Sequence, residues 1–133
     1  MATEIARGAR DAGVNVVSKT VFDCTIADML AADGIAFGSP TYYSNIAWQS
    51  KKFLDETIFE FYAQGHSLKG KVCGCFTSTG GYDDGKECLR MLELAFGYAL
   101  KMFMISGVVL ESKDIVDGNV SKCYDFGKRI AQD

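Results

Sequence analysis

The sequence is poor in the residues that mark metal and nucleic-acid sites. It has a single histidine, His66, and none of its cysteines shows the CxxC or Cys–His spacing of a zinc site. The net charge of −3 lacks the basic excess with which proteins bind nucleic acids, so we expect no nucleic-acid partner. No apolar run is long enough to cross a bilayer, so we expect no membrane span.

The cysteine count also argues against a disulfide framework. Five cysteines are an odd number, so they do not all pair within one chain. Cys73 and Cys75 stand two residues apart in an apolar run, which predicts buried, reduced thiols and a cytoplasmic protein. With 48% hydrophobic residues, the chain of 133 residues has enough apolar side chains to form a stable core without disulfide bonds or bound metal ions. We predict a single domain over residues 1–133.

Helical and strand patterns alternate along the chain. The predicted strands are residues 14–21, 34–38, 72–77 and 103–109. The predicted helices include residues 2–9, 25–28, 46–61, 89–99 and 120–131. Strands that alternate with helices predict an α/β fold, a doubly wound parallel sheet with helices on both faces and four strands from this chain.

Two polar segments follow the ends of predicted strands and are candidates for a binding site. They read GSPTYYSN over residues 38–45 and STGGYDDG over residues 78–85. In doubly wound sheets, ligands bind beyond the carboxyl ends of the strands. Pro40 stiffens the backbone, Gly80 and Gly81 allow close approach, and tyrosine rings stack on flat ligands. The two segments therefore predict a site for a flat, polar, aromatic ligand.

Helix capping is an alternative role for part of these segments. Ser44 or Asn45 and Asp83 or Asp84 are placed to cap the helices that follow them. Capping explains less well why two consecutive tyrosines follow a proline. Both interpretations therefore stay open at this point.

The segments FGSPTYYSNIAWQSKKFLDE and CFTSTGGYDDGKE resemble the two flavin-ring loops of the flavodoxin-like family. The nearest branch is that of the NAD(P)H:quinone oxidoreductases and NADPH-dependent FMN reductases. The resemblance implies a flavodoxin-like fold, FMN as cofactor and NAD(P)H as possible reductant. It implies no metal and no catalytic side chain, since the flavin carries the chemistry. The cofactor-binding residues that it implies are Pro40, Thr41, Tyr42, Tyr43, Ser44 and Asn45 in one loop and Ser78, Thr79, Gly80, Gly81 and Tyr82 in the other.

The resemblance also predicts what this chain lacks. The family begins with a strand and a phosphate-binding loop, whereas this sequence begins with a segment that resembles the helix after that loop. We therefore expect an N-terminally truncated fold, natural or not, in which FMN binding is weakened or lost. Without the first strand, the predicted strands over residues 14–21 and 34–38 would each have an unpaired edge. We expect one of three outcomes: a strand of another chain pairs with these edges, the strands of this chain pair differently, or the edges stay unpaired and weaken the fold locally.

Three functions follow as hypotheses. The first is an FMN-binding oxidoreductase that uses NAD(P)H to reduce a quinone or a flavin. The second is a flavodoxin-type electron carrier, and the third is a domain that no longer holds FMN. The partner would be a small-molecule substrate or a redox protein. The branch forms oligomers, so we expect a homo-oligomer. Phe59, Phe61 and Tyr62 crowd aromatic rings at the end of one predicted helix, although core packing explains some of them equally well.

Overall fold

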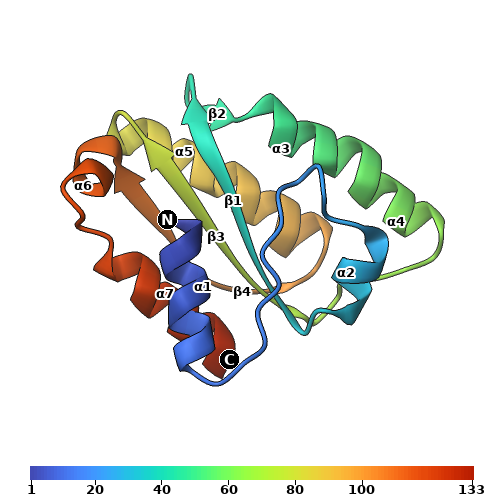
Figure 1. Cartoon of the computed structure of the whole chain (residues 1–133). Coiled ribbons are helices and arrows are strands. Elements are labelled where there is room, and N and C mark those ends of the chain that lie inside the picture. Colours follow the sequence, from blue (N-terminus) through green and yellow to red (C-terminus); the bar gives the residue numbers. More distant parts are fainter.

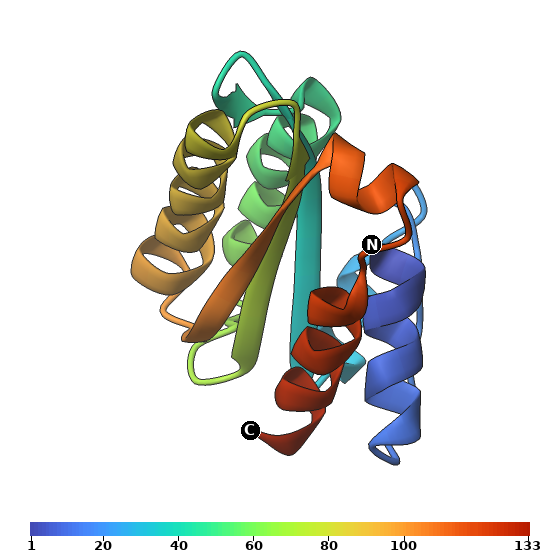
Figure 2. The ribbon, with the colours of Figure 1, turned by 90° about the vertical axis from the view of Figure 1, so that its left-hand side faces the viewer.

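The computed structural model describes residues 1–133 and shows a central sheet between two layers of helices (Figures 1 and 2). The strands are β1 (Gly34–Tyr42), β2 (Asn45–Ile46), β3 (Val72–Thr79) and β4 (Phe103–Glu111). Their order in the sheet is β2-β1-β3-β4, with β1, β3 and β4 parallel and β2 antiparallel to β1. The predicted parallel α/β sheet with helices on both faces is confirmed.

The helices divide between the two faces of the sheet. In Figure 2, α1 (Ala2–Asp11) and α7 (Ser121–Gln132) lie on one side, and the helices that follow β1 and β3 lie on the other. The remaining helices are α2 (Ile26–Ala31), α3 (Trp48–Lys52), η1 (Phe53–Ile58), α4 (Phe59–Ala63), α5 (Tyr82–Glu93), η2 (Leu94–Ala99) and α6 (Ser112–Val116). The segments η1 and η2 are π-helical, and none of the helices combines the length and apolar character that a bilayer crossing needs.

Each face of the sheet has its own apolar core. On one face, the ring of Phe37 in β1 packs between Phe53 and Phe96, with ring centroids 5.7 and 4.7 Å away. On the other face, Phe126 of α7 packs over Gly74 of β3, where a Cβ atom would lie 2.5 Å from the Phe126 ring. Burial of such aromatic rings supplies much of the stability of a domain of this size.

Helix α1 reaches the protein core through a close contact with α7 that depends on two glycines. A Cβ atom on Gly8 would lie 2.0 Å from the carbonyl oxygen of Tyr124. A Cβ atom on Gly127 would lie 1.9 Å from the carbonyl oxygen of Ile5. The backbones therefore touch at this crossing, and Arg7 stacks over the Tyr124 ring at 4.6 Å beside it.

The strand predicted over residues 14–21 is wrong. The segment is extended and runs past β1 towards α2 (Figure 1), but apart from turn bonds to the Thr20 carbonyl it makes no backbone hydrogen bond. Val14 and Val17 are exposed. Valine content indicates a strand only where a partner supplies a hydrogen-bond ladder, and this segment has none. The segment is held to the fold by a side-chain bond from Lys19 to Asp28, at 2.8 Å, and by Val21, which packs against the apolar core.

Strand β1 has an open outer edge, as the sequence predicted. Strand β2 pairs only with Thr41 and Tyr42, so no strand lies beside the outer edge of β1 over residues 34–40. This stretch of β1 carries no charged side chain. Residues 34–40 therefore have the composition of a central strand, although they lie at the edge of the sheet. Their outward backbone N–H and C=O groups have no neighbouring strand to bond.

The start of α2 follows the sequence prediction. Thr25 Oγ1 accepts a hydrogen bond from the Asp28 amide, and the Asp28 carboxylate accepts one from the Thr25 amide. These bonds form a capping box. Hydrogen bonds from Lys19 and then from Thr25 lower the pKa of Asp28 to about 2. Gly13, with a left-handed φ of +94°, follows the end of α1, and α6 was not among the predicted helices.

We predict that Gly127→Ala lowers the free energy of unfolding by about 2 kcal/mol. The clash with Ile5 outweighs the gain in helix propensity, which is about 1 kcal/mol. Gly34→Ala is the matched control, because its Cβ would meet nothing nearer than 3.6 Å. Urea denaturation of the three proteins measures the difference. Equal stability of Gly127→Ala and the parent chain would show that the helices are not in backbone contact.

Candidate functional site

The two predicted ring-binding segments meet at one edge of the sheet. β1 and β3 are parallel neighbours, with Ser39 opposite Thr77 and Pro40 opposite Ser78. Both strands therefore end at the same rim. In Figure 1, the hairpin at the end of β1 stands beside the start of α5, which follows β3. This is the arrangement in which doubly wound sheets bind ligands.

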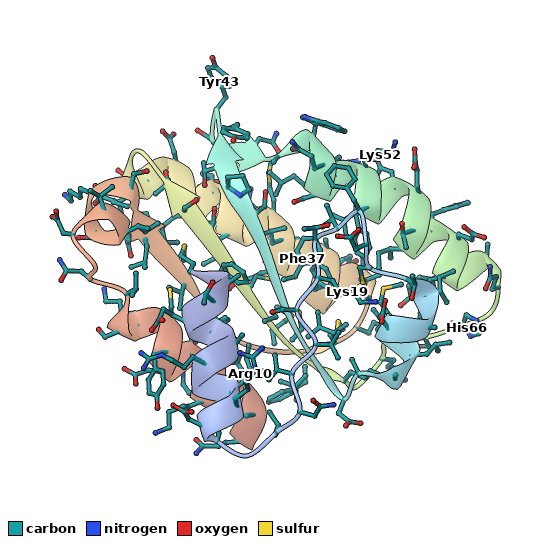
Figure 3. The ribbon with its side chains drawn as sticks, viewed as in Figure 1. Arg10, Lys19, Phe37, Tyr43, Lys52 and His66 are labelled. Carbon is teal, nitrogen blue, oxygen red and sulfur yellow. The ribbon has the colours of Figure 1, made fainter.

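The first segment is a tight hairpin rather than the loop predicted from Ser39 onward. β1 continues to Tyr42, which pairs with Asn45 across a two-residue turn. The turn residues Tyr43 and Ser44 have φ of 51° and 60°. Such turns normally take asparagine and glycine, so two ordinary side chains in this backbone conformation are strained. In Figure 3, Tyr43 projects from the tip of the hairpin into solvent.

The capping interpretation of the polar residues is wrong. Helix α3 begins after Ala47 and α5 after Gly81, and neither has a side-chain cap. Instead, Ser44 Oγ donates to Asp84 Oδ1 at 2.5 Å and joins the two segments. Asp83 pairs with Lys86 at 2.7 Å, and that hydrogen bond lowers the pKa of Asp83.

Buried hydroxyl groups connect the strands directly beneath the rim. Thr77 is fully buried, and its Oγ1 lies 2.7 Å from the Ser39 carbonyl oxygen and 2.8 Å from Thr41 Oγ1. Ser39 Oγ accepts a hydrogen bond from the Ala47 amide at 2.9 Å. Sequence reasoning placed Ser39 and Thr77 at the boundary of strand and loop and assigned them no role. Hydroxyls at alternate positions, 39 and 41 in one strand and 77 and 79 in the other, were the available signal.

The second segment is a short turn held by its own hydroxyl. Thr79 Oγ1 accepts from the Gly81 amide at 3.1 Å and donates to the Gly81 carbonyl at 2.6 Å. Ser112, which follows β4, donates to the Thr79 carbonyl at 3.0 Å and was not predicted. A Cβ atom on Gly80 would meet nothing within 4 Å. A ligand can therefore approach the backbone at Gly80 closely.

Aromatic rings flank this open backbone. Tyr42, the last residue of β1, is 56% exposed, and Tyr82, the first residue of α5, is 53% exposed. A hollow of about 580 Å³ is lined by residues of β2, α3 and η1, and it includes Asn45 but none of residues 78–82. The surface between the two segments is therefore an open rim, with tyrosine faces and backbone polar groups available to a planar ring.

The eleven residues predicted to bind cofactor thus lie together, although their binding role stays a prediction. The residues at the rim fit a flat heterocycle with a polar edge: an unobstructed glycine backbone, half-exposed tyrosines and fixed hydroxyls. No group of three or more histidine, cysteine or acidic side chains is arranged to hold a metal ion.

A parallel sheet with this rim defines the class of protein: a flavodoxin-like α/β domain. Within that class, residues 8–115 match the family of NADPH-dependent FMN reductases, and the chain belongs to this family. The resemblance on which the sequence prediction rested is confirmed.

Individual relatives agree with this assignment. The chain is 29% identical to a flavodoxin of Aquifex aeolicus over 146 residues, covering 99% of this chain and 77% of the relative. It is 35% identical to NAD(P)H dehydrogenase (quinone) 3 of Rhizobium meliloti over 107 residues, covering 65% of this chain and 50% of the relative. It therefore matches only half the length of that quinone dehydrogenase. The solved structure of a WrbA-like flavodoxin of Agrobacterium tumefaciens is similar with a TM-score of 0.75 and 27% identity, covering 98% of this chain and 84% of that one.

The strained turn yields a prediction. We expect Tyr43→Asn to raise the free energy of unfolding by about 0.5 kcal/mol, because asparagine tolerates the left-handed backbone better and Tyr43 is fully exposed. Tyr98→Asn is the control, since Tyr98 is also exposed but its φ is not positive. Thermal and urea denaturation measure both variants. A loss of stability in Tyr43→Asn would show that the tyrosine ring makes contacts at the hairpin tip.

Proposed function

We propose that this protein is an FMN-binding oxidoreductase that uses NAD(P)H to reduce a quinone or a flavin. The observation that carries the proposal is the meeting of the two segments at one rim, where Thr41 and Thr77 connect them at 2.8 Å. Membership in the FMN reductase family supports the cofactor, and the quinone dehydrogenase relatives support the acceptor.

In this proposal the chain binds and orients the flavin ring. Residues 40–45 would form one wall of the ring site and residues 78–82 the other. The half-exposed rings of Tyr42 and Tyr82 would stack on the heterocycle, and the open backbone at Gly80 would bond its polar edge. FMN, when bound, supplies hydride acceptance from NAD(P)H and electron transfer to an acceptor. No side chain at the rim needs to act as an acid or base.

A flavodoxin-type electron carrier is the second candidate. The similarity to the Aquifex flavodoxin favours it, because that similarity extends over 99% of this chain. Such a carrier would bind FMN at the same rim and would receive its electrons from a partner protein. The two candidates differ in one measurable property, since only the oxidoreductase oxidises NAD(P)H by itself.

The proposal also includes a cytoplasmic location and a homo-oligomeric state. A cytoplasmic location is supported by five unpaired cysteines, four of which are buried. A hydrogen bond with Cys73, together with burial, raises the pKa of Cys75 and keeps that thiol protonated.

A homo-oligomer is supported by exposed apolar residues near the point where Tyr62 donates to the Leu100 carbonyl, at 3.4 Å. The exposed rings at or near these two residues in the sequence include Phe59, Tyr62 and Phe103.

Association is testable on the unmodified chain. Because an exposed group of large aromatic side chains is uncommon on a monomer, we expect sedimentation velocity at micromolar concentration to show a dimer or larger species. The double variant Phe59→Ser, Phe103→Ser should shift the distribution towards monomer. A parent chain that sediments as a monomer at 100 μM, roughly the upper concentration of such runs, would contradict the proposal.

Flavin titration tests the proposed function. We expect Tyr42→Ala to raise the Kd for FMN about tenfold, because loss of ring stacking costs about 1.4 kcal/mol. Tyr98→Ala is the matched control, because Tyr98 is 82% exposed and lies in η2, at the far end of the helix that begins with Tyr82. Quenching of flavin fluorescence measures the Kd, and loss of NAD(P)H absorbance with a quinone present measures turnover.

Each outcome of this experiment separates the candidates. FMN binding that Tyr42→Ala weakens and Tyr98→Ala leaves intact, with NAD(P)H oxidation, supports the oxidoreductase. Binding without NAD(P)H oxidation supports the electron carrier. No binding of FMN at any concentration, or an equal effect of the two variants, would contradict a flavin site at this rim.

A further inference from the structure

Thr77 is a hydroxyl residue in a position where an apolar side chain is expected. It ends the buried run from Val72 to Phe76 and is fully inaccessible to solvent. Cys88 Sγ lies 3.6 Å from its oxygen, so α5 covers it from outside. A buried hydroxyl destabilises a core unless it is hydrogen-bonded, and valine would fill the same volume without that requirement. Core packing alone therefore does not explain a hydroxyl group at position 77.

The single proton of Thr77 fixes the direction of those bonds. Its shortest contact is to the Ser39 carbonyl oxygen at 2.7 Å, and a carbonyl only accepts. With that proton committed, the 2.8 Å contact between Thr77 Oγ1 and Thr41 Oγ1 requires Thr41 to donate. Thr41 thereby directs its own proton inward and keeps its lone pairs free. Thr41 is half-buried and sits at the rim itself.

We propose that Thr77 is a positioning residue, which holds Thr41 as a hydrogen-bond acceptor facing the ligand and fixes the hairpin to the end of β3. The inference rests on the proposed function, because the ligand group that Thr41 would accept from is an N–H on the edge of the flavin ring. Thr77 does not touch the ligand and acts through Thr41. The site thereby selects a heterocycle that donates at this point over one that only accepts.

The arrangement also couples the ring site to the rest of the rim. Thr41 pairs with Ile46 in the hairpin, and Ser39 holds the Ala47 amide through its side chain at 2.9 Å. The Thr77 hydroxyl thus restrains the β1 arm of the hairpin, and the Ser39 hydroxyl holds the residue that follows β2. The turn between the two arms is strained at Tyr43 and Ser44. Networks of fully bonded buried groups restrict a site to one geometry.

The test compares two substitutions at the same position. Thr77→Val keeps the shape and removes the hydroxyl, whereas Thr77→Ser keeps the hydroxyl and removes a methyl group. We expect Thr77→Val to raise the Kd for FMN about tenfold and Thr77→Ser to restore it to within about threefold of the parent. Thr41→Val should weaken binding by a similar factor, and the double variant Thr41→Val, Thr77→Val should be no weaker than Thr41→Val alone, since both changes remove one interaction.

A second measurement without flavin keeps the inference separate from the proposed function. Amide hydrogen exchange of residues 42–46 should be faster in Thr77→Val than in the parent chain and in Thr77→Ser. If no protein of the series binds FMN but the hairpin amides respond in this way, the proposed function fails and the positioning role of Thr77 stands. If Thr77→Val binds FMN and protects the hairpin as the parent does, or if Thr77→Ser loses as much as Thr77→Val, Thr77 has no positioning role.

Discussion

The parallel ladder between β1 and β3 is the interaction on which the candidate site depends. Its register sets Ser39 opposite Thr77 and Pro40 opposite Ser78, so the two strands end level with each other. A shift of one residue would turn Thr77 to the opposite face and break its bonds to Ser39 and Thr41. The register is in turn fixed by burial, since Phe37 must pack between Phe53 and Phe96 on the same face. The position of the rim therefore follows from packing in the core.

At the rim, several residues have backbone conformations or surroundings that their residue types usually avoid. Two ordinary residues occupy left-handed conformations at the hairpin tip, and hydroxyl groups replace apolar side chains in a buried layer. Each of these choices costs stability unless a neighbour compensates, as the Ser44–Asp84 bond and the Thr77 bonds do. At the opposite end of the sheet, Leu68, Leu100 and Met102 fill the core, and a single ordinary residue, Lys101, has a positive φ. The rim combines a strained turn with buried hydroxyl groups, a combination that is expected at a binding site.

Sequence reasoning succeeded where the signal was local or periodic. The apolar runs that became β1, β3 and β4 and the start of a helix at Thr25 are determined by residues near each other in the chain. It failed over residues 14–21, because a valine-rich segment becomes a strand only if a partner lies beside it, and partners are a property of the whole fold. It also failed for Ser44 and Asp84, which look like helix caps in sequence but lie 40 residues apart and bond each other. The hairpin at Tyr43 was not predicted since its turn lacks the usual asparagine and glycine.

The open edge of β1 and the close contact of α1 with α7 both concern how an apolar strand is shielded from solvent. A strand with the composition of a buried central strand needs cover on both faces as well as along its edge. Both faces are covered: Phe53 and Phe96 pack on one, and Ile130 of α7 reaches Gly34 on the other. The edge is covered only at Thr41 and Tyr42, where β2 turns back. The hairpin thus protects the part of β1 that carries the candidate site. Because Thr41 of β1 pairs with Ile46 of β2 and bonds Thr77 of β3, the end of the hairpin is held in place although the edge of β1 over residues 34–40 has no strand beside it.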